Sequence, residues 1–136
     1  MKERKNINRG FEKLRVWNEA VNVYVATCDI FKDSPFELKK IASNAIDAAQ
    51  SISRNIAEGY CRKGIKEYLQ FLNIALASSG ELHSCLLSSF RAQQITEQQY
   101  EHIDQIHYKM ENQLIKLIES IQMKMKKKDW DSSFAK

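Results

Sequence analysis

Residues 34–59 read SPFELKKIASNAIDAAQSISRNIAEG, a stretch with helical signals at both ends. Ser34 suits an N-cap, Pro35 the first helical position, and Glu37 the third position of a capping box. Gly59 suits a left-handed C-terminal cap. Between them, apolar residues recur at steps of three and four, at Leu38, Ile41, Ala45, Ala48, Ile52 and Ile56. This period is typical of one helix face, so the stretch predicts a helix over about 35–59.

Three further segments have the same periodicity and predict helices over about 11–31, 64–92 and 97–127. The first has its apolar stripe from Phe11 to Phe31. Gly80 lies in the middle of the second, and we interpret it as permitting a close helix crossing. The third begins with a second capping box, in which Thr96 is the cap and Gln99 reaches back.

Short connections between the four segments force sequential helices to run antiparallel. The fold class is therefore predicted to be all-α, an up-down-up-down four-helix bundle in a single domain over 1–136 with short basic terminal arms. One proline and four glycines are too few for the turns of a sandwich or barrel. No apolar run is long enough to span a membrane and no secretory signal follows Met1, so we expect a cytoplasmic protein. The helices are long for so small a domain, and oligomerisation is expected for that reason.

The net charge of +4 is unevenly distributed along the chain. Residues 1–15 contain six basic and two acidic side chains, and residues 116–136 contain six basic and three acidic ones. The segment between them is net acidic. Basic termini of this kind act as electrostatic arms for phosphate or as solvating tails, and both interpretations are open at this stage.

Motifs for catalysis or metal binding are not found. Three cysteines are an odd number, and no pair has the Cys-x-x-Cys spacing of zinc and redox sites. Asp104-x-x-His107 is the nearest approach to a di-iron motif, and no other helix offers a matching carboxylate. Neither a nucleophile elbow nor a glycine-rich phosphate loop occurs. The sequence therefore predicts no enzymatic activity, no metal and no cofactor.

One polar segment interrupts the apolar pattern and carries a resemblance to a known family. Its residues are Ser51-Ile52, Asn55-Ile56-Ala57-Glu58-Gly59 and Arg62, followed by Phe71-Leu72 and Ala75. Upstream, Phe11-x-x-Leu14-x-Val16-Trp17 and Phe31-x-x-x-Pro35-x-Glu37-Leu38 fit the same pattern. Over residues 11–121 the chain closely resembles the ribosomal RNA intervening-sequence proteins, also described as ribosomal protein S23-like.

The resemblance implies a left-handed up-down bundle that assembles into a ring-like homopentamer, in a cytoplasmic bacterial protein with no known enzyme activity. A related branch is the accessory variability determinant of diversity-generating retroelements, which binds nucleic acid and a reverse transcriptase. Many members have an Arg-Arg pair before the Asn-Ile-Ala-Glu-Gly core, where this sequence has Ile46 and Asp47. Loss of these guanidiniums weakens phosphate affinity on that face.

We therefore expect nucleic-acid contacts at other basic residues: Arg54, Arg62, Lys63, Lys66, Lys124, Lys126, Lys127 and Lys128. For the signature residues Asn55, Glu58 and Gly59 a structural role is favoured. Asn55 is expected to bond to backbone groups, Glu58 to pair with Arg62 or with another subunit, and Gly59 to turn the chain.

Two functional hypotheses follow. In the first, a homo-oligomeric accessory protein binds RNA or DNA weakly and without sequence preference. In the second, the ring is a protein-interaction scaffold for a reverse transcriptase or another protein, with Tyr60, Trp130 and Phe134 as exposed aromatic anchors.

Overall fold

The computed structural model describes residues 1–127, and every regular element within that range is helical. The all-helical prediction is thereby confirmed. The elements are the 3-10 helices η1 (Ile7–Lys13) and η2 (Phe36–Leu38) and the α-helices α1 (Arg15–Phe31), α2 (Lys39–Tyr60), α3 (Ile65–Arg91) and α4 (Glu97–Lys127). Lys128, Trp130 and Phe134, named above, lie outside the described residues.

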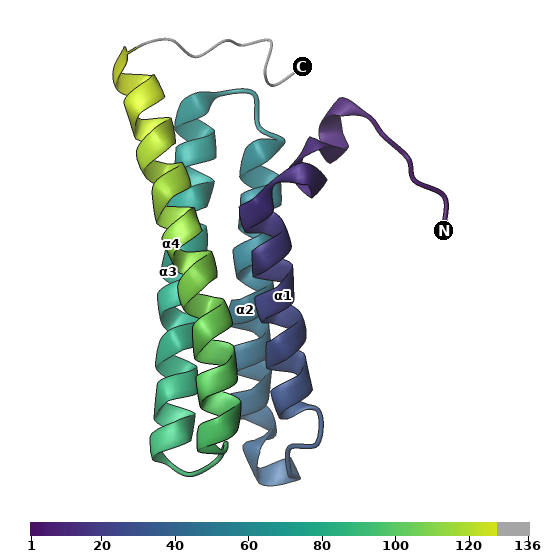
Figure 1. The fold of residues 1–136 in the computed structure, drawn as a ribbon, viewed down its shortest axis with the longest axis vertical. Helices are drawn as coiled ribbons and strands as arrows, with labels where there is room; N and C mark the ends of the chain where they lie inside the picture. The colour runs from purple at the N-terminus through teal and green to yellow at the C-terminus, as the bar shows by residue number, and fades with distance from the viewer. Residues whose placement is uncertain (128–136) are drawn as a thin grey trace.

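The four α-helices lie side by side, and consecutive helices run in opposite directions (Figure 1). Each helix contacts the next one in the chain, and α1 also contacts α4. Most of the predicted stripes of α2, α3 and α4 face inward, and the largest fully buried side chains include Ile52, Ile56, Leu72, Leu82, Leu86, Ile103, Met110 and Leu114. In α1 the buried face is instead Val16, Ala20, Val23, Thr27 and Phe31, and the predicted stripe shares only Phe31 with it. Burial of about 1.5–3 kcal/mol per large apolar side chain makes this core the main stabilising element.

The first α-helix begins at Arg15, four residues later than the periodicity predicts. Leu14 has an extended backbone (φ −70°, ψ 125°) that separates α1 from η1. The side-chain amide of Asn18 donates hydrogen bonds to the carbonyl oxygens of Glu12 and Leu14, both at 2.9 Å. This amide satisfies carbonyl groups at the junction, so the chain bends there instead of continuing one helix.

The two capping boxes have opposite outcomes. At α4 the prediction is confirmed, because the Gln99 N–H donates to Thr96 Oγ1 at 3.0 Å and the Thr96 N–H donates to Gln99 Oε1 at 2.9 Å. At α2 it is wrong, because Pro35 is extended (φ −63°, ψ 158°) and begins a 3-10 turn without a side-chain cap. The α-helix itself starts only at Lys39.

The structure corrects the roles that the sequence predicts for two glycines. Gly59 lies inside α2, and no glycine among residues 1–127 has a positive φ. A Cβ at Gly59 would lie 2.8 Å from the Cβ of Phe71, so this glycine permits the close approach of α2 and α3. Gly80 has no atom within 4 Å of such a Cβ, so it permits no close crossing. Within residues 1–127, no helix combines the length and the apolar character of a membrane span.

Candidate nucleic-acid interface

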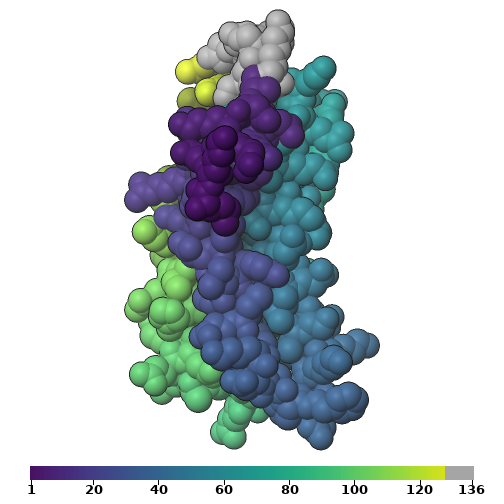
Figure 2. Space-filling model, turned by 90° about the vertical axis from the view of Figure 1, so that its right-hand side faces the viewer, coloured from purple at the N-terminus to yellow at the C-terminus, as the bar shows by residue number. Residues whose placement is uncertain are grey.

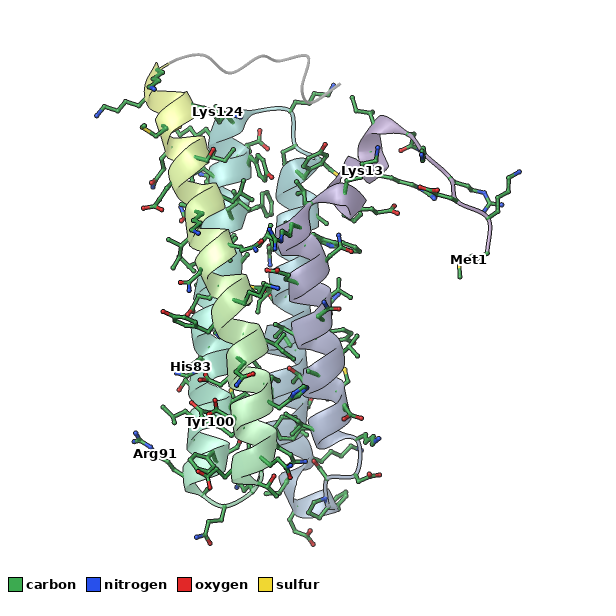
Figure 3. The ribbon with its side chains drawn as sticks, in the orientation of Figure 1. Met1, Lys13, His83, Arg91, Tyr100 and Lys124 are labelled. Atoms are coloured by element: carbon green, nitrogen blue, oxygen red, sulfur yellow. The ribbon has the colours of Figure 1, made fainter. Side chains whose placement is uncertain are left out.

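Basic residues that are far apart in sequence meet at one end of the molecule. The last turn of α4, the connection between α2 and α3, and η1 all lie at this end, where Lys13 and Lys124 are labelled (Figure 3). We call this surface the basic end and define it by Arg4, Lys5, Arg9, Lys13, Arg62, Lys63, Lys66, Lys124, Lys126 and Lys127. The antiparallel course of the helices produces it, because α1 begins where α4 ends.

Lys63 lies in the α2–α3 connection, and Lys66 lies in the first turn of α3. Both are exposed, and neither makes an ion pair within residues 1–127. Lys126 and Lys127 are exposed in the last turn of α4. Each of these ammonium groups keeps its hydrogen-bond donors available, which is the condition for binding phosphate.

Arg62 is engaged within the protein. Its Nη2 lies 3.5 Å from Glu58 Oε2, which confirms the predicted pair, and its Nη1 lies 3.7 Å from Glu67 Oε2. The guanidinium carbon also lies 4.9 Å from the ring centre of Phe71. Two carboxylates balance this cation, so Arg62 holds the α2–α3 connection more than it offers charge to a ligand.

Arg54 lies apart from the basic end. It is exposed on α2, six residues before Tyr60 or about 9 Å along the helix axis. Its Nη1 donates to Gln50 Oε1 at 2.7 Å on the preceding turn. Arg54 can extend a contact that begins at the basic end, and it does not form part of the cluster.

The N-terminal segment contributes to the site in a way that periodicity does not reveal. A Cβ at Gly10 would lie 2.5 Å from the hydroxyl of Tyr60, so η1 seats closely on the end of α2. The thiol of Cys61 donates to the carbonyl oxygen of Asn8 at 3.3 Å. Burial, and secondarily the charge of Glu58, raises the pKa of this thiol. These contacts place Arg9 and Lys13 beside the α2–α3 connection. The only signal of this packing in the sequence is a glycine, Gly10, within a basic segment.

Tyr60 is not the exposed anchor that the scaffold hypothesis expected. Its ring is half-buried and meets the ring of Tyr68 edge-on, with centroids 6.1 Å apart. Gly10 approaches it on η1. Tyr68 is buried in turn, and this burial raises the pKa of its hydroxyl.

The signature residue Asn55 is buried and bonded inside the protein. Its Nδ2 donates to the backbone oxygen of Ser51 at 2.8 Å, as predicted, and lies 3.0 Å from Ser51 Oγ. Ser51 Oγ in turn lies 2.8 Å from Ser78 Oγ on α3. This polar chain links α2 to α3 and leaves little of Asn55 for a ligand.

Ile46 and Asp47 lie away from the basic end, in a groove of about 810 Å³ between α1 and α2. Tyr24, Phe31 and Phe36 also line the groove. The charged residues that line this groove are Lys32, Lys39 and Asp47, so its lining is mixed in character.

Asp104 and His107 do not form a metal pair. His107 is buried and its Nε2 lies 2.9 Å from the carbonyl oxygen of Ser79, whereas Asp104 pairs with His83 at 3.7 Å. No group of three potential metal-ligating side chains is found within residues 1–127.

Comparisons with known proteins agree with this architecture. The family model described as 23S rRNA-intervening sequence protein matches residues 12–119. A solved structure of a protein with unknown function from the S23 ribosomal protein family of Bacteroides thetaiotaomicron is similar in fold, with a TM-score of 0.68 and 24% identity. That alignment covers 76% of this chain and 97% of the other. Among curated proteins, none matches.

Proposed function

The chain belongs to the 23S rRNA-intervening sequence protein family, and on that premise we propose that it is a cytoplasmic, non-enzymatic accessory protein that binds nucleic acid through its basic end. The observation that carries the proposal is the convergence of η1, the α2–α3 connection and the α4 terminus on one surface. Clustered lysines release counterions from nucleic acid when they neutralise phosphates. Contacts of this kind fix orientation and carry no sequence information, so the affinity is weak and tolerant of sequence.

The proposal includes an up-down-up-down four-helix bundle that assembles into a ring-like homopentamer. Large apolar side chains at the surface support burial against further copies of the chain: Val25 is 59% exposed, Ile74 48% and Tyr108 64%. Native mass spectrometry tests the assembly directly. A mass five times that of the 15.8 kDa chain is expected, and a monomer would contradict it.

Fluorescence anisotropy with a labelled structured RNA and a duplex DNA, at several salt concentrations, tests the function. The test variant is Lys63→Gln/Lys66→Gln, and its matched control is Lys39→Gln/Lys40→Gln at the start of α2. The control also replaces two exposed lysines, at the opposite end of the molecule. Loss of two phosphate contacts lowers the slope of log K against log salt by about 2 for a duplex.

Three outcomes are informative. A reduced affinity and slope in the test variant, with the control close to the parent protein, supports binding through the basic end. No binding even at low salt contradicts the proposal and leaves the scaffold hypothesis, in which the partner is a reverse transcriptase or another protein. Binding that the two variants weaken equally contradicts the placement of the interface.

A further inference from the structure

A hollow of about 480 Å³ lies between the N-terminal residues, η1 and the end of α2. In Figure 2 the N-terminal segment lies in front of the upper part of the molecule, and Figure 1 shows that its first residues project away from the bundle beyond η1. Four cations line the hollow, namely Arg4, Lys5, Arg9 and Lys13, and Tyr60 contributes an aromatic wall. The sequence gives no motif for this site because its walls come from segments about fifty residues apart.

The lining contains four cations and two carboxylates, so its formal net charge is positive. Glu3 and Glu12 are the acidic residues of the lining, and Glu3 Oε1 pairs with Lys5 at 3.8 Å. Arg4, Arg9 and Lys13 make no ion pair within residues 1–127. Two guanidiniums and an ammonium group therefore face a confined space with their donors available, and guanidinium groups bind phosphate with two parallel hydrogen bonds.

Hydrogen bonds hold η1, one wall of the hollow, in place before any ligand arrives. Asn6 Oδ1 accepts a hydrogen bond from the Arg9 N–H at 3.1 Å, which fixes the first turn of η1. The Asn18 amide holds the other end of η1, through the carbonyl oxygen of Glu12. The thiol of Cys61, at the C-terminal end of α2, donates a hydrogen bond to the carbonyl oxygen of Asn8 in η1. A site whose backbone is already ordered loses less entropy when a ligand binds.

We propose that this hollow binds one phosphorylated nucleotide unit of a single-stranded nucleic acid, an inference that rests on the proposed function. Sites for small ligands have volumes of roughly 300–1,000 Å³, so this one accommodates a nucleotide, whereas a duplex can touch only its rim. The cations take the phosphate, and Tyr60 offers an aromatic contact to the base, as in sequence-tolerant single-strand binding. The remaining lysines of the basic end, near the α2–α3 connection and in the last turn of α4, then carry the flanking phosphates.

Anisotropy with a labelled ten-nucleotide single strand, as RNA and as DNA, and with the corresponding duplexes tests the inference on the full chain. The variant is Arg4→Gln/Arg9→Gln, and the matched control is Lys39→Gln/Lys40→Gln. We expect the single strand to bind about tenfold more tightly than the duplex. We expect the variant to lose about tenfold affinity for the single strand while duplex binding changes less than about twofold. A 5′-nucleoside monophosphate should compete with the single strand, and the RNA and DNA arms show which sugar is preferred.

A second variant, Gly10→Ala, displaces η1 from Tyr60 and should weaken single-strand binding without any change of charge. Far-UV circular dichroism checks that the helices remain. Equal affinity for single strand and duplex, with Arg4→Gln/Arg9→Gln weakening both alike, would overturn the inference and leave the basic end as a general phosphate surface. Absence of binding to either form would overturn the proposed function as well.

Discussion

Gly59→Ala and Gly80→Ala are expected to change stability in opposite directions. Both glycines lie inside α-helices, so alanine gains the same helix propensity at each, about 1 kcal/mol. At Gly80 nothing lies within 4 Å of the added methyl group, so the full gain is expected. At Gly59 the methyl would lie 2.8 Å from the Cβ of Phe71 and 3.2 Å from the backbone oxygen of Tyr68.

Neither of these atoms is the far end of a flexible side chain, so α2 and α3 must move apart. Overpacking of this kind costs about 1–3 kcal/mol. The propensity gain cancels between the two variants, and their difference in unfolding free energy therefore measures the steric cost at Gly59. Urea denaturation followed by circular dichroism, at one fixed protein concentration, gives that difference. If Gly59→Ala proves as stable as Gly80→Ala, the close approach of α2 and α3 is refuted.

Three further predictions concern caps, buried polar groups and pH. Thr96→Ala removes the hydrogen bond from the Gln99 N–H to Thr96 Oγ1 and should lower the unfolding free energy by about 1 kcal/mol in urea denaturation, with Thr27→Ser as a buried control. Asn55→Ala should cost about 1–3 kcal/mol in the same assay, because the buried contacts of the Asn55 amide with Ser51 are lost; an unchanged midpoint would contradict the link. Burial raises the pKa of Tyr68 above its ordinary value of 10.0, so the unfolded chain ionises first and stability should fall as pH rises above about 10. Denaturation at several alkaline pH values should show a smaller fall in Tyr68→Phe than in the parent.

Periodicity predicts the four long helices because each one buries a continuous apolar stripe, and burial outweighs local propensity. It fails at the N-terminal ends of α1 and α2, where single residues determine at which position the helix begins. Phe11 continues the apolar spacing of α1, yet Leu14 has an extended backbone there, and the amide of Asn18 bonds the carbonyl oxygens of Glu12 and Leu14 at this bend. Ser34 is a residue type that is common at N-caps, but the backbone of Pro35 is extended and the α-helix begins only at Lys39. These outcomes depend on hydrogen bonds that the spacing of apolar residues does not encode.

The candidate site was predictable in its charge and not in its shape. The basic ends are visible in the sequence, and the antiparallel course of four helices brings them together. The seating of η1 on Tyr60 joins residues about fifty positions apart and depends on the missing side chain of Gly10. The charge pattern alone also overstates how available Arg62 is to a ligand, because its two carboxylate partners become evident only in the folded α2–α3 connection.

The family signature and the proposed phosphate-binding lysines therefore lie in separate structural settings in this chain. Asn55 and Gly59 face the α2–α3 contact, one through a buried polar chain and the other by the absence of a side chain. Arg62 fixes the adjacent connection through Glu58 and Glu67. Lys63 and Lys66 then project from a connection whose geometry those residues determine. Substitutions in the signature should consequently lower stability first and binding only as a consequence, whereas the lysines can be replaced at little cost to the fold, so the two sets of variants separate structure from function.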